Sequence, residues 1–143
     1  MVAFQRALGI AVVSILLAGT PLVEAKSQGT NNQRSNTPAD VANAIAHTID
    51  ANTLKSRGAP LDFDSATAHD NVVEVRYIAN DFAAFDRFKR DSNAVRADLV
   101  GYYCDESRAA YLRQGVVIHQ TYVRSDSNDR VEFTIDTSSC DTR

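Results

Sequence analysis

Two cysteines, Cys104 and Cys140, limit what this 143-residue chain can fold into more than any other feature of its sequence. The chain starts with the features of an export signal, and exported proteins enter an oxidising compartment where two thiols within reach normally pair. We therefore expect a disulfide that closes the segment between them. A redox-active pair is the alternative, but the intervening sequence is much longer than in the C-x-x-C motif of such pairs.

The export signal is predicted at residues 1–25. Arg6 supplies a short basic start, and residues 7–18 form an uncharged apolar run. This run is shorter than the roughly 20 residues that cross a bilayer, which is typical of a secretion signal rather than of a membrane anchor. Val23-Glu24-Ala25 places small side chains at the two positions that a signal peptidase recognises. We expect cleavage after about Ala25, with an uncleaved anchor as the alternative.

The rest of the chain divides into a leader, residues 26–36, and one domain, residues 37–143. The leader has no apolar residue, so burial cannot offset the entropy lost on ordering, and we expect it to be flexible. The domain is long enough to bury a core and short enough to gain stability from a covalent link. The chain has a formal net charge of -3 and no run of Lys and Arg, so we expect neither nucleic acid nor an anionic membrane surface as a partner.

A first helix is predicted from about residue 38 to residue 54. Thr37 is suited to the N-cap, Pro38 to the first helical position and Asp40 to the positive end of the helix. Gly58 and Pro60 follow the helix and prevent it from continuing. The apolar residues at helical spacing are Val41, Ile45 and Ile49.

The period of the apolar residues then changes to two, which predicts strands. Leu61 and Phe63 alternate with aspartates, and Val73, Val75 and Tyr77 alternate with charged residues. A polar turn at residues 69–71 separates the two runs, so together they predict a β-hairpin.

A second, long helix is predicted over roughly residues 82–102, with Asn80 or Asp81 as its cap. Its main apolar residues fall within about 100° of arc, a stripe wide enough to cover a sheet. Phe82 and Val100 lie about 110° off this stripe at 3.6 residues per turn, and they are the candidate partner-binding residues. The alternative for Phe82 is packing on the preceding loop. The residues of the stripe are Phe85, Phe88, Val95, Leu99, Tyr102 and Tyr103.

The segment after the first cysteine predicts a short helix and a second hairpin. Asp105 is suited to cap a helix through Arg113, and Gly115 to the left-handed residue that ends it. Residues 116–124 and 130–137 are rich in β-branched and aromatic side chains and predict two strands. The whole order predicts an α+β domain, an antiparallel sheet of four or five strands with helices packed on one face. The residues of the last strand expected to face the core are Val131, Phe133 and Ile135.

The sequence contains no strong motif for chemistry. The three histidines, His47, His69 and His119, lack the spacing of metal ligands, and no nucleophile motif of a hydrolase is present. We therefore predict no catalytic residue, no metal site and no cofactor. Asp62 and Asp64 lie on one strand face, about 7 Å apart, but they suit acid–base chemistry only if one is perturbed, and a solvated edge is expected.

Several short segments together carry a resemblance to a known family. They are Gly58 with Pro60 before the first strand, Tyr77 and Asn80 at the end of the second, Tyr103-Cys104 at the end of a helix, Leu112 with Gly115, Tyr122-Val123-Arg124 in a strand, and the last cysteine, Cys140. Their order and spacing resemble the periplasmic pilotin (S protein) family of bacterial type II secretion systems, in the form found in vibrios. The resemblance spans roughly residues 40–140.

The resemblance implies an α+β domain with a Cys104–Cys140 disulfide and a binding function. Such a protein binds the C-terminal segment of the secretin, the channel subunit, and carries it to the outer membrane, which suits a helix-in-groove mode. Those pilotins are typically lipoproteins with a cysteine just after the apolar run, where this chain has Thr20. Without a thiol there is no lipid anchor, so we expect a periplasmic or secreted protein of a Gram-negative bacterium.

Two other functions remain open, a secreted inhibitor or other binder of an unknown protein, and a small periplasmic enzyme. An exposed apolar groove favours the pilotin-like adaptor, a rigid protruding loop favours the inhibitor, and a deep pocket with a buried titratable residue favours the enzyme. We expect a binding module without enzymatic activity.

Overall fold

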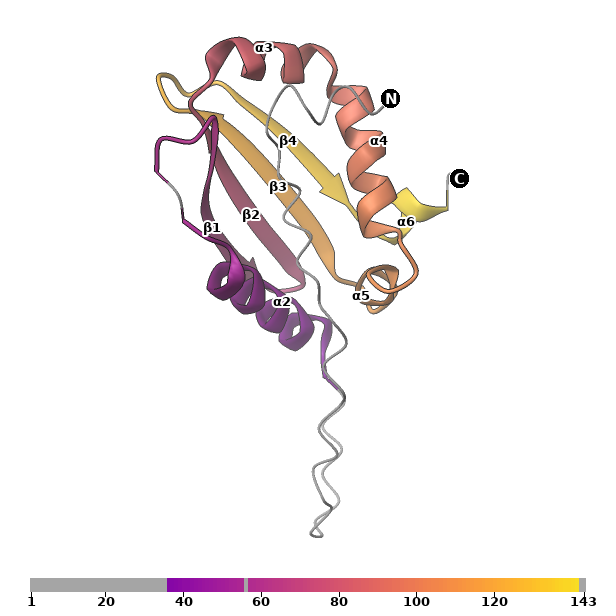
Figure 1. Cartoon of the computed structure of the whole chain (residues 1–143). Coiled ribbons are helices and arrows are strands. Elements are labelled where there is room, and N and C mark those ends of the chain that lie inside the picture. The colour runs from indigo at the N-terminus through magenta and orange to yellow at the C-terminus, as the bar shows by residue number, and fades with distance from the viewer. Residues whose placement is uncertain (1–35, 56, 142–143) are drawn as a thin grey trace, which may run out of the picture.

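A computed structural model describes residues 36–55 and 57–141 of the chain. The predicted signal peptide, its cleavage site and nearly all of the predicted leader lie outside the described residues. Figure 1 shows the described part as one sheet with helices along it. The elements are α2 (Pro38–Asn52), β1 (Leu61–His69), β2 (Val72–Ala79), α3 (Phe82–Arg90), α4 (Ser92–Tyr103), α5 (Ala109–Arg113), β3 (Val117–Arg124), β4 (Arg130–Ile135) and α6 (Thr137–Cys140).

The sheet has four strands in the order β1-β2-β3-β4. Both predicted hairpins are present, since β1 pairs with β2 and β3 with β4 in antiparallel fashion, and the α+β class is confirmed. The central strands β2 and β3 are parallel, so the sheet is mixed and the prediction of a wholly antiparallel sheet is corrected at this pair. The physical reason is the long connection, residues 80–116, which contains three helices and returns the chain to the end of the sheet where β2 began.

One face of the sheet, here called the inner face, forms the core. Alternate residues of each strand point to it and are buried, and the residues between them are mostly half-buried or exposed. Phe133 and Ile135 face the core as predicted, and Val131 is half-buried. The buried residues of the inner face are Phe63, Ala66, Val73, Val75, Ala79, Ile118, Gln120, Tyr122, Phe133 and Ile135.

Helix α2 starts at the predicted cap. The Thr37 hydroxyl accepts a hydrogen bond from the Asp40 N–H at 3.2 Å, and the Asp40 carboxylate accepts one from the Thr37 N–H at 2.9 Å. This reciprocal pair is a capping box, with Pro38 at the first helical position. The helix packs on β1 and β2 through Ala42 and Ala46, which are 0% and 4% exposed. These small residues let the helix approach the sheet closely.

The long helix predicted over residues 82–102 is in fact two helices. Helix α3 ends at Arg90, and Asp91, with φ -95° and ψ 21°, is at once the C-cap of α3 and the N-cap of α4. Figure 1 shows the two helices running in different directions. The reason is the sequence Asp91-Ser92-Asn93, because these side chains compete with helical hydrogen bonds. Phe82 and Val100 therefore do not share the flank of one helix.

The core has two clusters, one beside α2 and one beside α3. The first includes Val73, Val75 and Leu112, and the second includes Phe88 and Tyr122. Leu99 of α4 packs against both clusters but is only half-buried. Helix α4 has no buried residue at all, so its apolar side covers the sheet only partly.

Replacement of Phe88 by alanine should lower the free energy of unfolding by about 3 to 5 kcal/mol, because the ring is 5% exposed and fills the second cluster. Leu99→Ala should cost clearly less, because that side chain is half-buried on α4. Urea unfolding followed by circular dichroism measures both values, and Phe82→Ala, at a position that is 36% exposed, is the surface control. Equal losses for the Phe88 and Leu99 variants would contradict the partial packing of α4.

Candidate partner-binding face

The predicted disulfide is confirmed. Cys104 follows directly after α4 and Cys140 is the last residue of α6, and their Cα atoms are 5.4 Å apart. The bond fastens the C-terminal end of α4 to the segment that follows β4. Arg96 on the same helix donates a hydrogen bond to the carbonyl of Thr134 in β4 at 3.1 Å. Helix α4 is therefore tied to the end of the chain and to the edge strand.

The last strand is shorter than predicted, because the chain turns into α6 after Ile135. The Asp136 carboxylate accepts hydrogen bonds from the Ser138 hydroxyl at 2.7 Å and from the Ser139 N–H at 3.0 Å. These bonds hold the pKa of Asp136 below its ordinary value. The Thr137 hydroxyl donates to the carbonyl of Leu112 at 2.6 Å. The hydrogen bonds of Asp136 and of Thr137 together place Cys140 beside Cys104.

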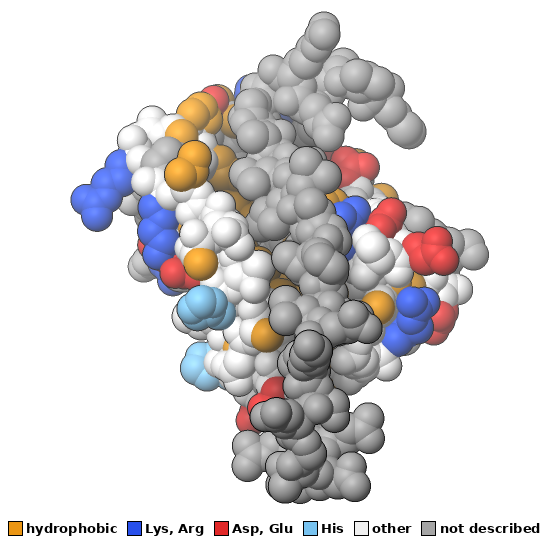
Figure 2. All heavy atoms as spheres, turned by 60° about the horizontal axis from the view of Figure 1, so that its bottom comes forward, with side chains coloured by type: hydrophobic (Ala, Val, Ile, Leu, Met, Phe, Trp, Pro, Cys, Tyr) orange, Lys and Arg blue, Asp and Glu red, His pale blue; other side chains and the backbone are white. Residues whose placement is uncertain are grey.

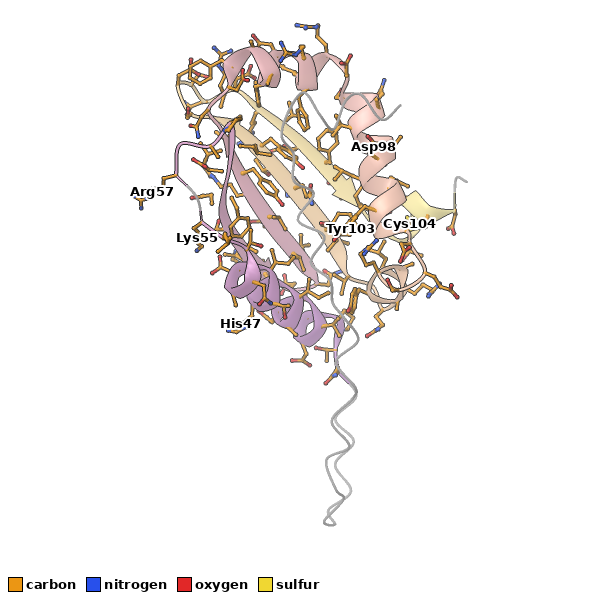
Figure 3. The ribbon with its side chains drawn as sticks, in the orientation of Figure 1. His47, Lys55, Arg57, Asp98, Tyr103 and Cys104 are labelled. Atoms are coloured by element: carbon orange, nitrogen blue, oxygen red, sulfur yellow. A yellow bond between two sulfur atoms is a disulfide. The ribbon has the colours of Figure 1, made fainter. Side chains whose placement is uncertain are left out.

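A chain of polar side chains joins α4 to the sheet. Tyr103 points from α4 toward the strands (Figure 3), and its hydroxyl accepts a hydrogen bond from Gln120 Nε2 at 2.6 Å. The Tyr122 hydroxyl donates to Gln120 Oε1 at 2.7 Å. Gln120 is 4% exposed, so these two partners satisfy a polar group within the core. The Tyr122 ring also stacks on that of Tyr77, with centroids 5.0 Å apart.

Burial controls the ionisation of these tyrosines. It raises the pKa of Tyr77 to about 12, and it also raises the pKa values of Tyr103 and Tyr122. All three phenols therefore keep their protons at alkaline pH values at which an ordinary tyrosine ionises. Sequence reasoning missed Gln120, although its place between Ile118 and Tyr122 in a strand with alternate buried positions was a signal that it points inward.

The inner face between α2 and α4 is the candidate binding surface. Helix α2 packs on β1 and β2, and α4 packs on β4. Figure 1 shows the two helices along opposite margins of the sheet, with the central strands running between them. Half-buried apolar residues from α2, from the sheet and from α4 pack on the core there. We call them the α2–α4 face, and they are Ile45, Ile49, Tyr77, Leu99, Val100 and Tyr103.

The two predicted partner residues have different surroundings. Val100 is half-buried, packs against the first core cluster and belongs to the α2–α4 face. Phe82 starts α3, is 36% exposed, and has the Arg124 guanidinium 4.7 Å from its ring centroid. Arg124 is in turn held by Asp86 and Asp126. Neither Phe82 nor Val100 is fully buried, so a role for them in partner binding stays a prediction.

The paired aspartates of the first strand have separate structural roles. The Asp62 carboxylate accepts hydrogen bonds from the Gly58 and Ala59 N–H groups at 2.8 and 3.0 Å, and it thereby fastens the loop before β1. Gly58 has φ +84°, a conformation that favours glycine. A bulge between residues 63 and 65 displaces Asp64, which pairs with Arg76 at 3.2 Å. The two carboxylates do not act as one pair.

Other features of the described residues give no sign of a chemical site. No group of three or more His, Cys, Asp or Glu side chains in residues 36–55 and 57–141 could hold a metal ion. Within the same part of the chain, no helix has both the length and the apolar character to cross a membrane. A cavity of about 20 Å³ lies between the start of β1 and α3, beside Phe85, Phe88 and Tyr122, and has room for roughly one water.

Figure 2 shows acidic and basic side chains intermixed on the face of the molecule that it draws.

Neither a protein-family profile nor a curated protein sequence matches the chain. Its fold, in contrast, is similar to solved structures. A candidate secreted protein of Pseudomonas aeruginosa aligns with a TM-score of 0.62 and 15% identity, over 72% of this chain and 92% of that chain. The pilotin EpsS of the Vibrio vulnificus type 2 secretion system aligns with a TM-score of 0.54 and 20% identity, over 72% of this chain and 91% of its own.

The Vibrio cholerae type II secretion pilotin AspS aligns with a TM-score of 0.54 and 16% identity, over 72% of this chain and 92% of its own. The chain has a pilotin-like fold. The resemblance found in the sequence is thereby confirmed for the architecture.

Loss of the disulfide should destabilise the pilotin-like domain. In the chain-entropy estimate, Cys104→Ser or Cys140→Ser costs about 3 to 4 kcal/mol, because the loop that the bond closes is long. Urea unfolding of each variant beside the unaltered protein measures this loss. Intact-mass measurement after thiol alkylation is the control, and two reactive thiols in the exported protein would contradict the bond.

Alkaline pH should destabilise the domain through the buried tyrosines. Because the pKa of Tyr77 is raised from 10.0 to about 12, the folded state keeps a proton that the unfolded state releases between these pH values. The free energy of unfolding should therefore be unaffected below about pH 10 and fall as the pH rises through about 12. Tyrosinate absorbance and urea unfolding measure both effects. Ionisation of all five tyrosines together near pH 10 in the folded protein would contradict the raised pKa values of Tyr77, Tyr103 and Tyr122.

Proposed function

We propose that this chain is an exported, non-enzymatic binding module with the role of a type II secretion pilotin. In this role it binds the C-terminal segment of a secretin and assists the targeting or assembly of that channel in the outer membrane. The observation that carries the proposal is the pilotin-like fold, which covers nearly the whole length of two pilotins. The order of sequence motifs around Gly58, Tyr103 and Cys140 supports it independently.

The α2–α4 face suits a helical partner. Neighbouring strands are about 4.8 Å apart and a helix with its side chains is about 10 Å across, so one helix would cover the two central strands. An amphipathic segment with apolar residues at i, i+3, i+4 and i+7 would then pack against α2 on one side and α4 on the other. Because α4 has no buried residue, its apolar side has contact area left for such a segment.

The ionisable groups of this face favour binding over catalysis. A tyrosine phenol is neutral near pH 7 in any case, and burial moves the pKa values of Tyr77 and Tyr103 still further above neutrality. A general base must instead lose its proton near the working pH. These two phenols are thus suited to donate hydrogen bonds to a bound molecule.

The proposed place of action rests on the predicted export signal. We propose that the protein is periplasmic or secreted after cleavage near Ala25, because Thr20 stands where pilotins of the vibrio type carry the lipidated cysteine. Without an acyl chain the protein would reach the outer membrane only through its partner.

A direct binding measurement tests the proposal. The mature protein, residues 26–143, titrated with a synthetic C-terminal peptide of the organism's own secretin, should bind with a Kd in the micromolar to nanomolar range, about -8 to -12 kcal/mol. Val100→Asp should weaken binding strongly because it places a charge on the α2–α4 face. Phe82→Ala tests the second candidate residue, and Glu132→Ala, exposed on the opposite face of the sheet, is the control.

Absence of both heat and chemical-shift change at millimolar peptide would contradict the pilotin role. Loss of binding in the Glu132 variant would show that the partner lies on the other face of the sheet.

A further inference from the structure

Tyr77 brings to the α2–α4 face a hydroxyl that has no hydrogen-bond partner among the described residues. Its ring is fixed, because it stacks on Tyr122 at 5.0 Å and meets Phe63 edge-on at 5.9 Å. No buried side-chain oxygen or nitrogen in the described part of the chain lacks a partner. The Tyr77 hydroxyl must therefore reach the surface of this face, where a fixed ring presents it to whatever binds.

Tyr103 brings a second hydroxyl, whose hydrogen is also free to be donated. Its oxygen accepts the hydrogen bond from Gln120 Nε2, so the hydrogen points elsewhere. If the oxygen and nitrogen of the Gln120 amide exchanged places, the oxygen would accept the hydrogen of the Tyr103 hydroxyl. The hydrogen of the Tyr122 hydroxyl would then have no acceptor. Tyr122 is 8% exposed and Tyr103 is half-buried, so the orientation that satisfies Tyr122 is the favoured one.

The two free donors restrict the chemistry of a partner. A purely aliphatic segment on this face would offer neither hydroxyl an acceptor and would remove that of Tyr77 from water, which disfavours binding. Backbone carbonyls inside a helix are already bonded within that helix. Away from the last turn of a helix, whose carbonyls have no partner within it, the matching group is therefore a side-chain oxygen.

We propose that the segment bound by the α2–α4 face carries an Asn, Gln, Asp or Glu side chain within its apolar stripe, and that its oxygen accepts hydrogen bonds from the hydroxyls of Tyr77 and Tyr103. These two tyrosines are then specificity determinants, because they select segments with an acceptor at this position over wholly apolar ones. This inference rests on the proposed function and names the chemical group that the site would recognise in its partner.

Single-atom substitutions test the inference. Tyr77→Phe and Tyr103→Phe each remove one hydroxyl and keep the ring, and each should weaken binding of the secretin C-terminal peptide about 5- to 20-fold. Tyr77→Phe is the cleaner variant, because this hydroxyl has no bond within the described residues that could be lost. Tyr111→Phe is the matched control, since Tyr111 is a half-buried tyrosine of α5 outside the α2–α4 face.

A second set of peptides completes a double-mutant cycle. In these, each Asn, Gln, Asp or Glu of the apolar stripe is replaced by Leu, one at a time. One of these peptides should bind the unaltered protein more weakly and should show no further loss with the Tyr77 and Tyr103 variants. Unaltered affinity of both variants for the original peptide would overturn the inference and leave the proposed function standing. If the unaltered protein does not bind the original peptide, the proposed function and this inference fall together.

Discussion

The parallel pairing of β2 with β3 is the constraint on which the rest of the architecture depends. Two antiparallel hairpins can join side by side in parallel only if the chain returns to the end of the sheet where β2 began. The connection at residues 80–116 makes this return and carries α3, α4 and α5 with it. Since α2 already packs on β1 and β2, the crossover places α4 near the other margin, on β4. The inner side of the central strands then lies between the two helices.

Directed bonds, together with partial burial, set the position of α4. The helix has no buried residue, and it is held by the Cys104–Cys140 disulfide, by the Arg96 hydrogen bond to Thr134 and by the contact of Tyr103 with Gln120. A helix fixed in this way keeps its apolar side chains only half-buried. That arrangement suits a face that binds a partner, because the contact area is not already used within the domain.

Local signals in the sequence predicted most of the helices and strands. The features that depend on contacts between distant residues could not be predicted from these signals. The capping box of Thr37 with Asp40, the alternation in both hairpins and the disulfide follow from neighbouring residues or from the compartment. The parallel pairing depends on two strands far apart in sequence, which local periodicity does not report. The break at Asp91 was visible as three helix-competing residues, but the apolar period continues across it. For the α2–α4 face, the projection of one long helix pointed to Val100 but not to Tyr77 or Gln120, which come together only when the sheet and α4 pack against each other.

The central claim is that a partner binds between α2 and α4. Backbone amide chemical shifts of the mature protein, recorded during titration with the secretin C-terminal peptide, test it most directly because they report every element at once. The account predicts perturbations concentrated in α2, in α4 and at the inward positions of β2 and β3. Perturbations confined to the opposite face of the sheet, at residues such as Thr67, Glu74 and Glu132, would contradict it.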